Sequence, residues 1–168
     1  IGAGTATKLA MKTQPAAPAA NGGILATQPA VYIQDQYGNT TSSTATVDAA
    51  VGAGTWTLGG TTSVAGIAGT TTYSGLTATS AGAVTGATIA FSSTGLTGVT
   101  SGTFDIPAPA PTITASVATL TGFTYSQGAG PSTEKNFVVS GLNLTADISI
   151  TPPADYEIST GTGGSFVA

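Results

Sequence analysis

The chain has 168 residues, of which 40% are hydrophobic and only 6% are charged, and its formal net charge is −4. It lacks histidine, cysteine and arginine, which excludes a Ser-His-Asp or Cys-His catalytic site and a zinc site built on these ligands. Lys8, Lys12 and Lys135 are the only cations, which excludes a basic surface for nucleic-acid phosphates or anionic lipid headgroups. This inventory disfavours an enzyme.

The chain begins at Ile1 without a basic start followed by an apolar middle, and no apolar run approaches the roughly 18 residues of a membrane helix. We therefore expect a processed product or an excerpt of a longer protein, without membrane insertion. Few Lys, Arg and Glu residues beside abundant Thr, Ser, Gly and Ala are typical of exported proteins. This composition predicts an extracellular or cell-surface location.

Short strands are predicted over residues 1–106, because Gly and Thr interrupt every window long enough for a helix. Apolar residues alternate in six rows: Leu9 and Met11, Val31 and Ile33, Ala45 to Val51, Trp56 and Leu58, Ala87 to Phe91, and Phe104 and Ile106. Residues 35–39 (Asp-Gln-Tyr-Gly-Asn) predict a turn, and Gly59-Gly60 predicts a two-residue hairpin turn between 56–58 and 61–65. The pattern is typical of an antiparallel β-sandwich.

Three prolines in residues 107–111 predict a semi-rigid linker between a first domain at 1–106 and a second at 112–168. Alternation then resumes and predicts about four strands, with these rows: Ile113, Ala115 and Val117; Phe137 and Val139; Ile148 and Ile150; Tyr156 and Ile158. Such a short sheet leaves an edge and half a core exposed. Either the domain continues beyond this chain, or another chain supplies the missing strands.

Two family resemblances extend this prediction. The opening strand at 6–15, the strand and turn at 31–39, residues 54–60, Gly75-Leu76 and the closing 101–106 resemble the bacterial immunoglobulin-like domains of invasin- and intimin-type surface proteins. Residues 120–123, 130–132, 137–144, 148–153 and 156–159 are similar to immunoglobulin-like repeats of Bacteroidetes-type secreted and surface proteins. The resemblance implies an all-β tandem of immunoglobulin-like sandwiches, the second incomplete. Neither family supplies catalytic residues.

The acidic residues offer two candidate sites. Asp155 and Glu157 would point to one face of a predicted strand, where a solvated face is the favoured interpretation and weak calcium binding the alternative. Asp35 could join Asn39 in a calcium site, but we favour a turn whose carboxylate accepts backbone N–H groups. No cofactor is predicted.

Other side chains have a plain and a special interpretation. Lys8 and Lys12 lie on the presumed polar face of the opening strand, so solvated lysines are favoured over a covalent Lys–Asn cross-link. Trp56 alternates in phase with Leu58, which favours the core over a sugar-stacking platform. Asn39-Thr40-Thr41 and Asn143-Leu144-Thr145 match the N-glycosylation pattern.

The leading hypothesis is a non-catalytic repeat or subunit of a bacterial stalk, adhesin or filament. Its partners would be copies of itself or neighbouring repeats of a longer chain, joined by strand addition at the incomplete second domain. The predicted self-assembly edge contains Phe137, Val139, Ile148, Ile150, Tyr156 and Ile158. The alternative is an accessory module of a larger secreted enzyme that binds a glycan or receptor, with Tyr32 and Tyr37 as candidate contacts.

Overall fold

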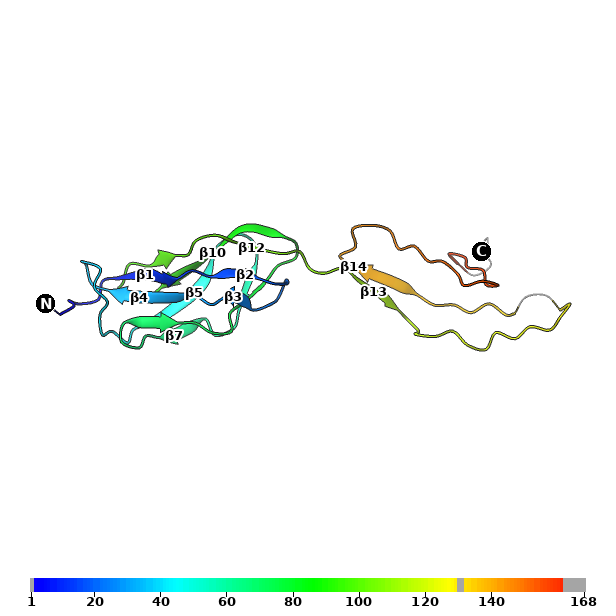
Figure 1. The fold of residues 1–168 in the computed structure, drawn as a ribbon, viewed down its shortest axis with the longest axis horizontal. Helices are drawn as coiled ribbons and strands as arrows, with labels where there is room; N and C mark the ends of the chain where they lie inside the picture. Colours follow the sequence, from blue (N-terminus) through cyan, green and yellow to red (C-terminus); the bar gives the residue numbers. More distant parts are fainter. Residues whose placement is uncertain (1, 130–131, 162–168) are drawn as a thin grey trace. The chain divides into compact units, whose positions relative to one another are not determined.

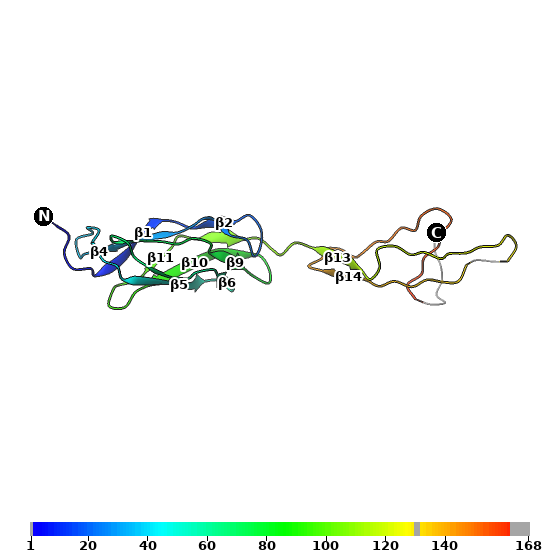
Figure 2. The same ribbon diagram turned by 90° about the horizontal axis from the view of Figure 1, so that it is seen from below.

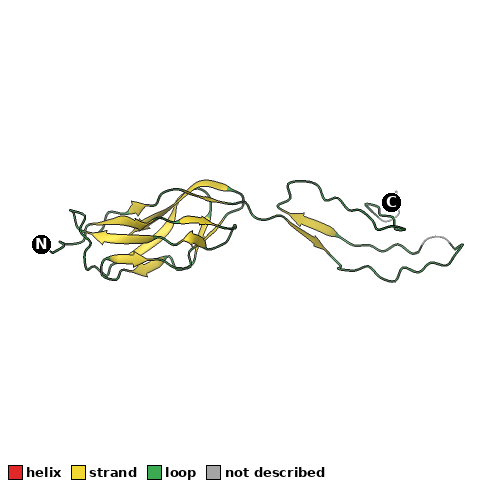
Figure 3. Cartoon of the chain, viewed as in Figure 1, coloured by secondary structure: helices red, strands yellow, loops and turns green. Residues whose placement is uncertain are grey.

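The computed structural model describes residues 2–129 and 132–161, which form strands and turns without a helix. The chain divides into two units, Ile1–Ala110 and Pro111–Ala168, which meet inside the proline-rich segment 107–111. Every pairing between the named strands is antiparallel. The all-β class is therefore confirmed, as Figure 3 shows by colour.

Two sheets form the body of unit 1 (Figures 1 and 2). The first has the strand order β1 (Lys8–Thr13), β4 (Ala30–Gln34) and β8 (Thr70–Thr72). The second has the order β11 (Val99–Thr100), β10 (Val84–Ser92), β5 (Thr46–Ala53) and β7 (Ser63–Ala65), and β12 (Phe104–Ile106) also pairs with β10. Two further pairs are β2 (Ala16–Pro18) with β3 (Leu25–Thr27), and β6 (Thr57–Gly59) with β9 (Thr77–Thr79).

The core of unit 1 is a single cluster to which both sheets contribute. In β4, Val31 and Ile33 are fully buried, whereas the alternate residues Tyr32 and Gln34 are partly exposed. From the second sheet, Phe91 of β10 reaches the same cluster. Two antiparallel sheets that share one apolar core make an antiparallel β-sandwich.

The predicted hairpin at Gly59-Gly60 is wrong. β6 pairs with β9, and β7 pairs with the beginning of β5, so the segments on either side of these glycines enter different sheets. Gly60 has a φ of 93°, and a Cβ on it would overlap the carbonyl oxygen of Gly75. The glycine therefore serves a close approach of two segments instead of a two-residue turn.

Unit 2 contains two strands within its described residues, β13 (Thr112–Ala115) and β14 (Val139–Leu142). The strands predicted at 148–150 and 156–158 are wrong, because 148–150 have no ladder partner and 156–158 contain only a single bridge residue, Ile158. The backbone has a positive φ at Asn143, before residues 148–150, and at Asp155, immediately before residues 156–158. Each interrupts extended structure. Asp155 lies in a turn, so the predicted strand face shared with Glu157 is not formed.

Candidate functional site

The candidate site is the two-stranded sheet of unit 2. β13 pairs with β14 in the register Thr112↔Leu142 to Ala115↔Val139. The ladder extends one step further, since the N–H of Ser116 donates to the carbonyl of Val138 over 2.8 Å. No third strand joins this sheet within residues 111–129 and 132–161, so each strand has one side without a ladder partner.

The register identifies which backbone groups face these open sides. Hydrogen-bonded pairs alternate along an antiparallel ladder, and Ser116 points its N–H toward β14. Thr112 and Thr114 therefore also face β14, and Ile113 and Ala115 direct their N–H and C=O groups to the open side of β13. By the same alternation, Val139 and Gly141 face the open side of β14.

One face of the sheet is apolar. Residues opposite each other in an antiparallel pair lie on the same face, which places Ile113 beside Gly141 and Ala115 beside Val139. The other face carries Thr112, Thr114, Ser140 and Leu142. The isoleucine side chain on the apolar face is 62% exposed and the leucine on the other face is 70% exposed.

Burial separates the two units. All the buried apolar side chains of the described residues belong to unit 1, and no described residue of unit 2 is buried. The large apolar side chains that unit 2 exposes include Ile113, Val117, Tyr125, Val138, Leu142, Leu144, Ile150 and Tyr156. Unit 2 therefore leaves in water the surface that a sheet normally buries in a core.

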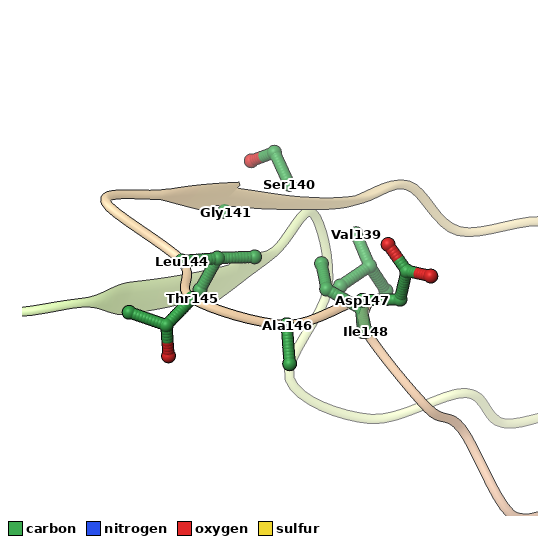
Figure 4. A pocket seen from close by; sticks show the side chains of 8 residues that line it. All are labelled: Val139, Ser140, Gly141, Leu144, Thr145, Ala146, Asp147 and Ile148. Carbon is green, nitrogen blue, oxygen red and sulfur yellow. The ribbon is translucent and has the colours of Figure 1, made fainter.

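A hollow lies beside β14 (Figure 4). After the strand, the segment 144–148 turns back along the sheet, and Leu144 packs so closely on Gly141 that a Cβ there would overlap it. Figure 4 shows Ser140 on the side away from this segment. Val139, Ile148 and the carboxylate of Asp147 also line the hollow. The apolar face is thus half covered on the side of β14.

The six residues of the predicted self-assembly edge do not form one edge. Val139 lies in β14 and shares the hollow with Ile148, and Phe137 immediately precedes the strand. Tyr156 instead contacts Phe123 edge to face, with ring centroids 5.3 Å apart. Ile150 is exposed and Ile158 is partly exposed, and neither belongs to a named strand.

Sequence reasoning missed the clearest open side, which belongs to β13. Ile113 was recognised as one of an alternating row, but alternation reports the side-chain face and not the direction of the backbone groups. Only the register with β14 shows that its N–H and C=O point away from the sheet. The sequence signal for an unprotected strand edge is the absence of charged residues between Asp105 and Glu134.

The carboxylate of Asp35 holds the turn at 35–39. Its Oδ1 accepts hydrogen bonds from the backbone N–H groups of Tyr37 (3.0 Å) and Asn39 (2.9 Å). Its Oδ2 accepts hydrogen bonds from the side-chain Nδ2 of Asn39 (2.9 Å) and from the backbone N–H of Gly4 (2.9 Å). These donors, the side-chain amide first, lower the pKa of Asp35 from 3.8 to about 2. Both oxygens are thus engaged by N–H groups, as the turn interpretation predicts.

The surroundings of Lys8, Lys12 and Trp56 are those of ordinary surface and core residues. The Nζ of Lys8 donates to the carbonyl of Gln36 at the surface (3.4 Å), and the Nζ of Lys12 lies 5.2 Å from the ring centroid of Tyr32. Trp56 is 9% exposed, packs edge to face on Phe104, and donates its indole N–H into the backbone. The tryptophan is therefore a core residue, and the lysines lie at the surface.

Comparison with models of known protein families and with curated proteins finds no match for this chain. The described residues contain no helix that is long and apolar enough to cross a membrane. Acidic side chains in the same part of the chain do not gather in groups of three or more that would suit a metal ion.

Proposed function

We propose that the chain is a non-catalytic structural subunit or repeat of an extracellular bacterial stalk, adhesin or filament. In this proposal both units are immunoglobulin-like sandwiches, and unit 2 is completed by a strand from another chain. The observation that carries the proposal is the combination of open strand edges and exposed apolar side chains in unit 2.

Strand addition would supply what unit 2 lacks. A two-stranded sheet is marginal in water, whereas three or more strands over a covered apolar face are stable. An added strand pairs with the open backbone groups and covers neighbouring side chains. Complete burial of an exposed side chain of this size contributes about 1.5–3 kcal/mol, which is the upper bound for Ile113 or Leu142. The low charge of the chain also leaves little repulsion between copies.

The test follows association and strand protection in the full chain. We expect the sedimentation coefficient to rise with concentration, and amide exchange at 112–115 and 139–142 to slow in parallel. Amides of β4 and β10 in unit 1 serve as the internal control, because their protection should be independent of concentration. Electron microscopy of assembled material should show fibres with a repeat of one or two domain lengths. A monomer at all concentrations with protected β13 and β14 amides would contradict the proposal.

A glycan-binding module is the second candidate, and Tyr37 is the observation that favours it. This side chain is 81% exposed and borders a hollow formed with residues of the amino-terminal segment and of the turn at 35–39. A glycan array should then show one consistent ligand that Tyr37→Ala abolishes. Tyr125→Ala is the matched control, because Tyr125 is an exposed tyrosine of unit 2. An array without a reproducible ligand removes this candidate.

A further inference from the structure

We propose that the open side of β13 pairs with β13 of a second copy of this chain, antiparallel and centred on Thr114. This inference rests on the proposed function, since it names the edge and the partner through which unit 2 joins another chain. The result is a four-stranded sheet in the order β14, β13, β13 of the second copy and β14 of the second copy.

The two edges of the sheet differ in access. Beside β14, the returning segment 144–148 lines a hollow together with Val139 and Gly141, whose backbone groups face the open side of this strand, and Asp147 adds a carboxylate there. All four residues of β13 are exposed, and its open side faces no other strand of the described residues. An incoming strand therefore meets fewer obstacles at β13.

The charge pattern favours a second copy as the partner, because it leaves nothing in β13 that would repel an identical strand. Between Asp105 and Glu134 the sequence has no charged residue, so β13 lies within a neutral stretch. In a two-fold contact the side chain on the axis lies opposite its own copy, so a charge there would meet a like charge. Natural sheet edges commonly use Lys or another inward charge to prevent this pairing. β13 has none.

The backbone directions determine the register. Ile113 and Ala115 present their N–H and C=O groups to the open side, so the two hydrogen-bonded pairs join Ile113 of each copy to Ala115 of the other. This register puts Ile113 and Ala115 of both copies on one continuous apolar face. Thr114 then lies opposite Thr114 of the second copy on the other face, in a non-hydrogen-bonded pair with Cα atoms about 4.5 Å apart.

The absence of cysteine from the chain permits a direct test of this register. In Thr114→Cys the two thiols face each other at a Cα separation that suits a disulfide. In Thr112→Cys, the matched control on the same strand and face, each cysteine lies opposite Ser116 of the other copy. The two control thiols are then four residues apart along the strands, about 13 Å.

Mild oxidation of the full-length variants should give a disulfide-linked dimer of Thr114→Cys and leave Thr112→Cys largely unlinked. Fluorescence of Trp56, the only tryptophan, verifies that unit 1 is folded in both variants. Equal cross-linking of the two variants overturns the register. Failure of Thr114→Cys to cross-link at concentrations where the native chain self-associates overturns the pairing.

Charge substitution tests the two-fold contact without a covalent bond. Thr114→Lys and Thr114→Glu each place like charges opposite each other, and we expect each to weaken self-association at least about tenfold. An equimolar mixture of the two variants should restore association, because opposite charges then meet across the axis. Native-like association of either variant alone contradicts the proposal, as does a mixture that stays dissociated.

The outcomes separate this inference from the proposed function. If the native chain associates but the Thr114 variants behave as the native chain does, another edge is used and the structural function stands. If the native chain remains a monomer and the amides of 112–115 and 139–142 are protected from exchange, both fail.

Discussion

The hydroxyl of Tyr73 donates a hydrogen bond of 2.8 Å to the backbone carbonyl of Val47. Tyr73 directly follows β8 of the three-stranded sheet, and Val47 belongs to β5 of the five-stranded sheet. The bond is buried and thus ties the two sheets of unit 1 through the core.

Removing this hydroxyl should destabilise unit 1 while the ring packing is retained. Tyr73→Phe keeps the contact with Phe91, where the ring centroids are 5.4 Å apart. We expect the free energy of unfolding to fall by about 1 kcal/mol, the net worth of one hydrogen bond. Urea denaturation followed by Trp56 fluorescence measures the change, and Tyr32→Phe at the surface is the control. An unchanged midpoint in Tyr73→Phe would show that the bond contributes nothing.

The same tyrosine should make the stability of unit 1 depend on pH in the alkaline range. Burial, with a smaller contribution from the charge of Asp48, raises the pKa of Tyr73 well above its usual 10. Because the folded-state pKa is the higher one, its contribution to stability is complete below about pH 10 and declines above it. Native protein should therefore lose stability with rising pH more steeply than Tyr73→Phe. Parallel pH profiles of the two proteins would contradict this expectation.

Asp35 predicts a dependence at acid pH. Its pKa is about 2 in the folded protein against 3.8 unperturbed, so its contribution to stability is present above about pH 4 and declines as the pH falls toward 2. Asp35→Asn should be less stable than the native protein at neutral pH, because its amide NH₂ faces other donors. The difference should shrink between pH 4 and pH 2. Asp105→Asn, which loses only an exposed contact to Gly86, is the control.

Thr71 predicts a stabilising substitution. Its hydroxyl is fully buried and has no hydrogen-bond partner among the described residues. Thr71→Val replaces that hydroxyl with a methyl group of similar size and should raise the free energy of unfolding by about 1 kcal/mol. The matched control is Thr41→Val. The Thr41 hydroxyl donates to the carbonyl of Ile33 over 3.0 Å, so its removal should lower the free energy of unfolding. Thermal unfolding should move the two variants in opposite directions.

Substitution of Gly60 should destabilise unit 1 by more than the strain of its positive φ, because a side chain there also has a steric overlap. Gly60→Ala places a Cβ into the carbonyl oxygen of Gly75 and also forces alanine to a φ of 93°. Gly95 has a similarly positive φ of 77° with open space around it, so Gly95→Ala measures the backbone strain alone. We expect Gly95→Ala to cost about 1 kcal/mol and Gly60→Ala clearly more. Equal losses would contradict the close approach.

Sequence patterns predicted unit 1 better than unit 2 for a physical reason. The rows containing Leu9, Val31 and Ile89 became strands because a sheet on each side of the core rewards alternation. The rows around Ile148 and Tyr156 have the same alternation, but the described part of unit 2 gives them no strand to pair with. A strand is a property of its neighbours as much as of its own residues.

Local sequence patterns also could not predict which strands of unit 1 pair with each other. Gly59-Gly60 has the composition of a hairpin turn, yet β6 pairs with the later strand β9 and β7 pairs with the earlier strand β5. The Asp35 turn could be predicted because its donors at Tyr37 and Asn39 are local in sequence. Its fourth donor, Gly4, comes from a distant segment and had no local signal.

The amide of Asn21 also determines how unit 1 would carry a load. Its Nδ2 donates to the carbonyl of Pro107 over 2.8 Å and to the hydroxyl of Ser80 over 2.8 Å. Near the other end, the backbone around Lys8 forms a parallel bridge with Thr97. Tension applied through residues 107–111 would therefore be shared with the connection between β2 and β3 and would not pull on β12 alone. Under the same tension the parallel bridge at the opposite end would be pulled along its strands, so its bonds would resist together instead of opening one after another.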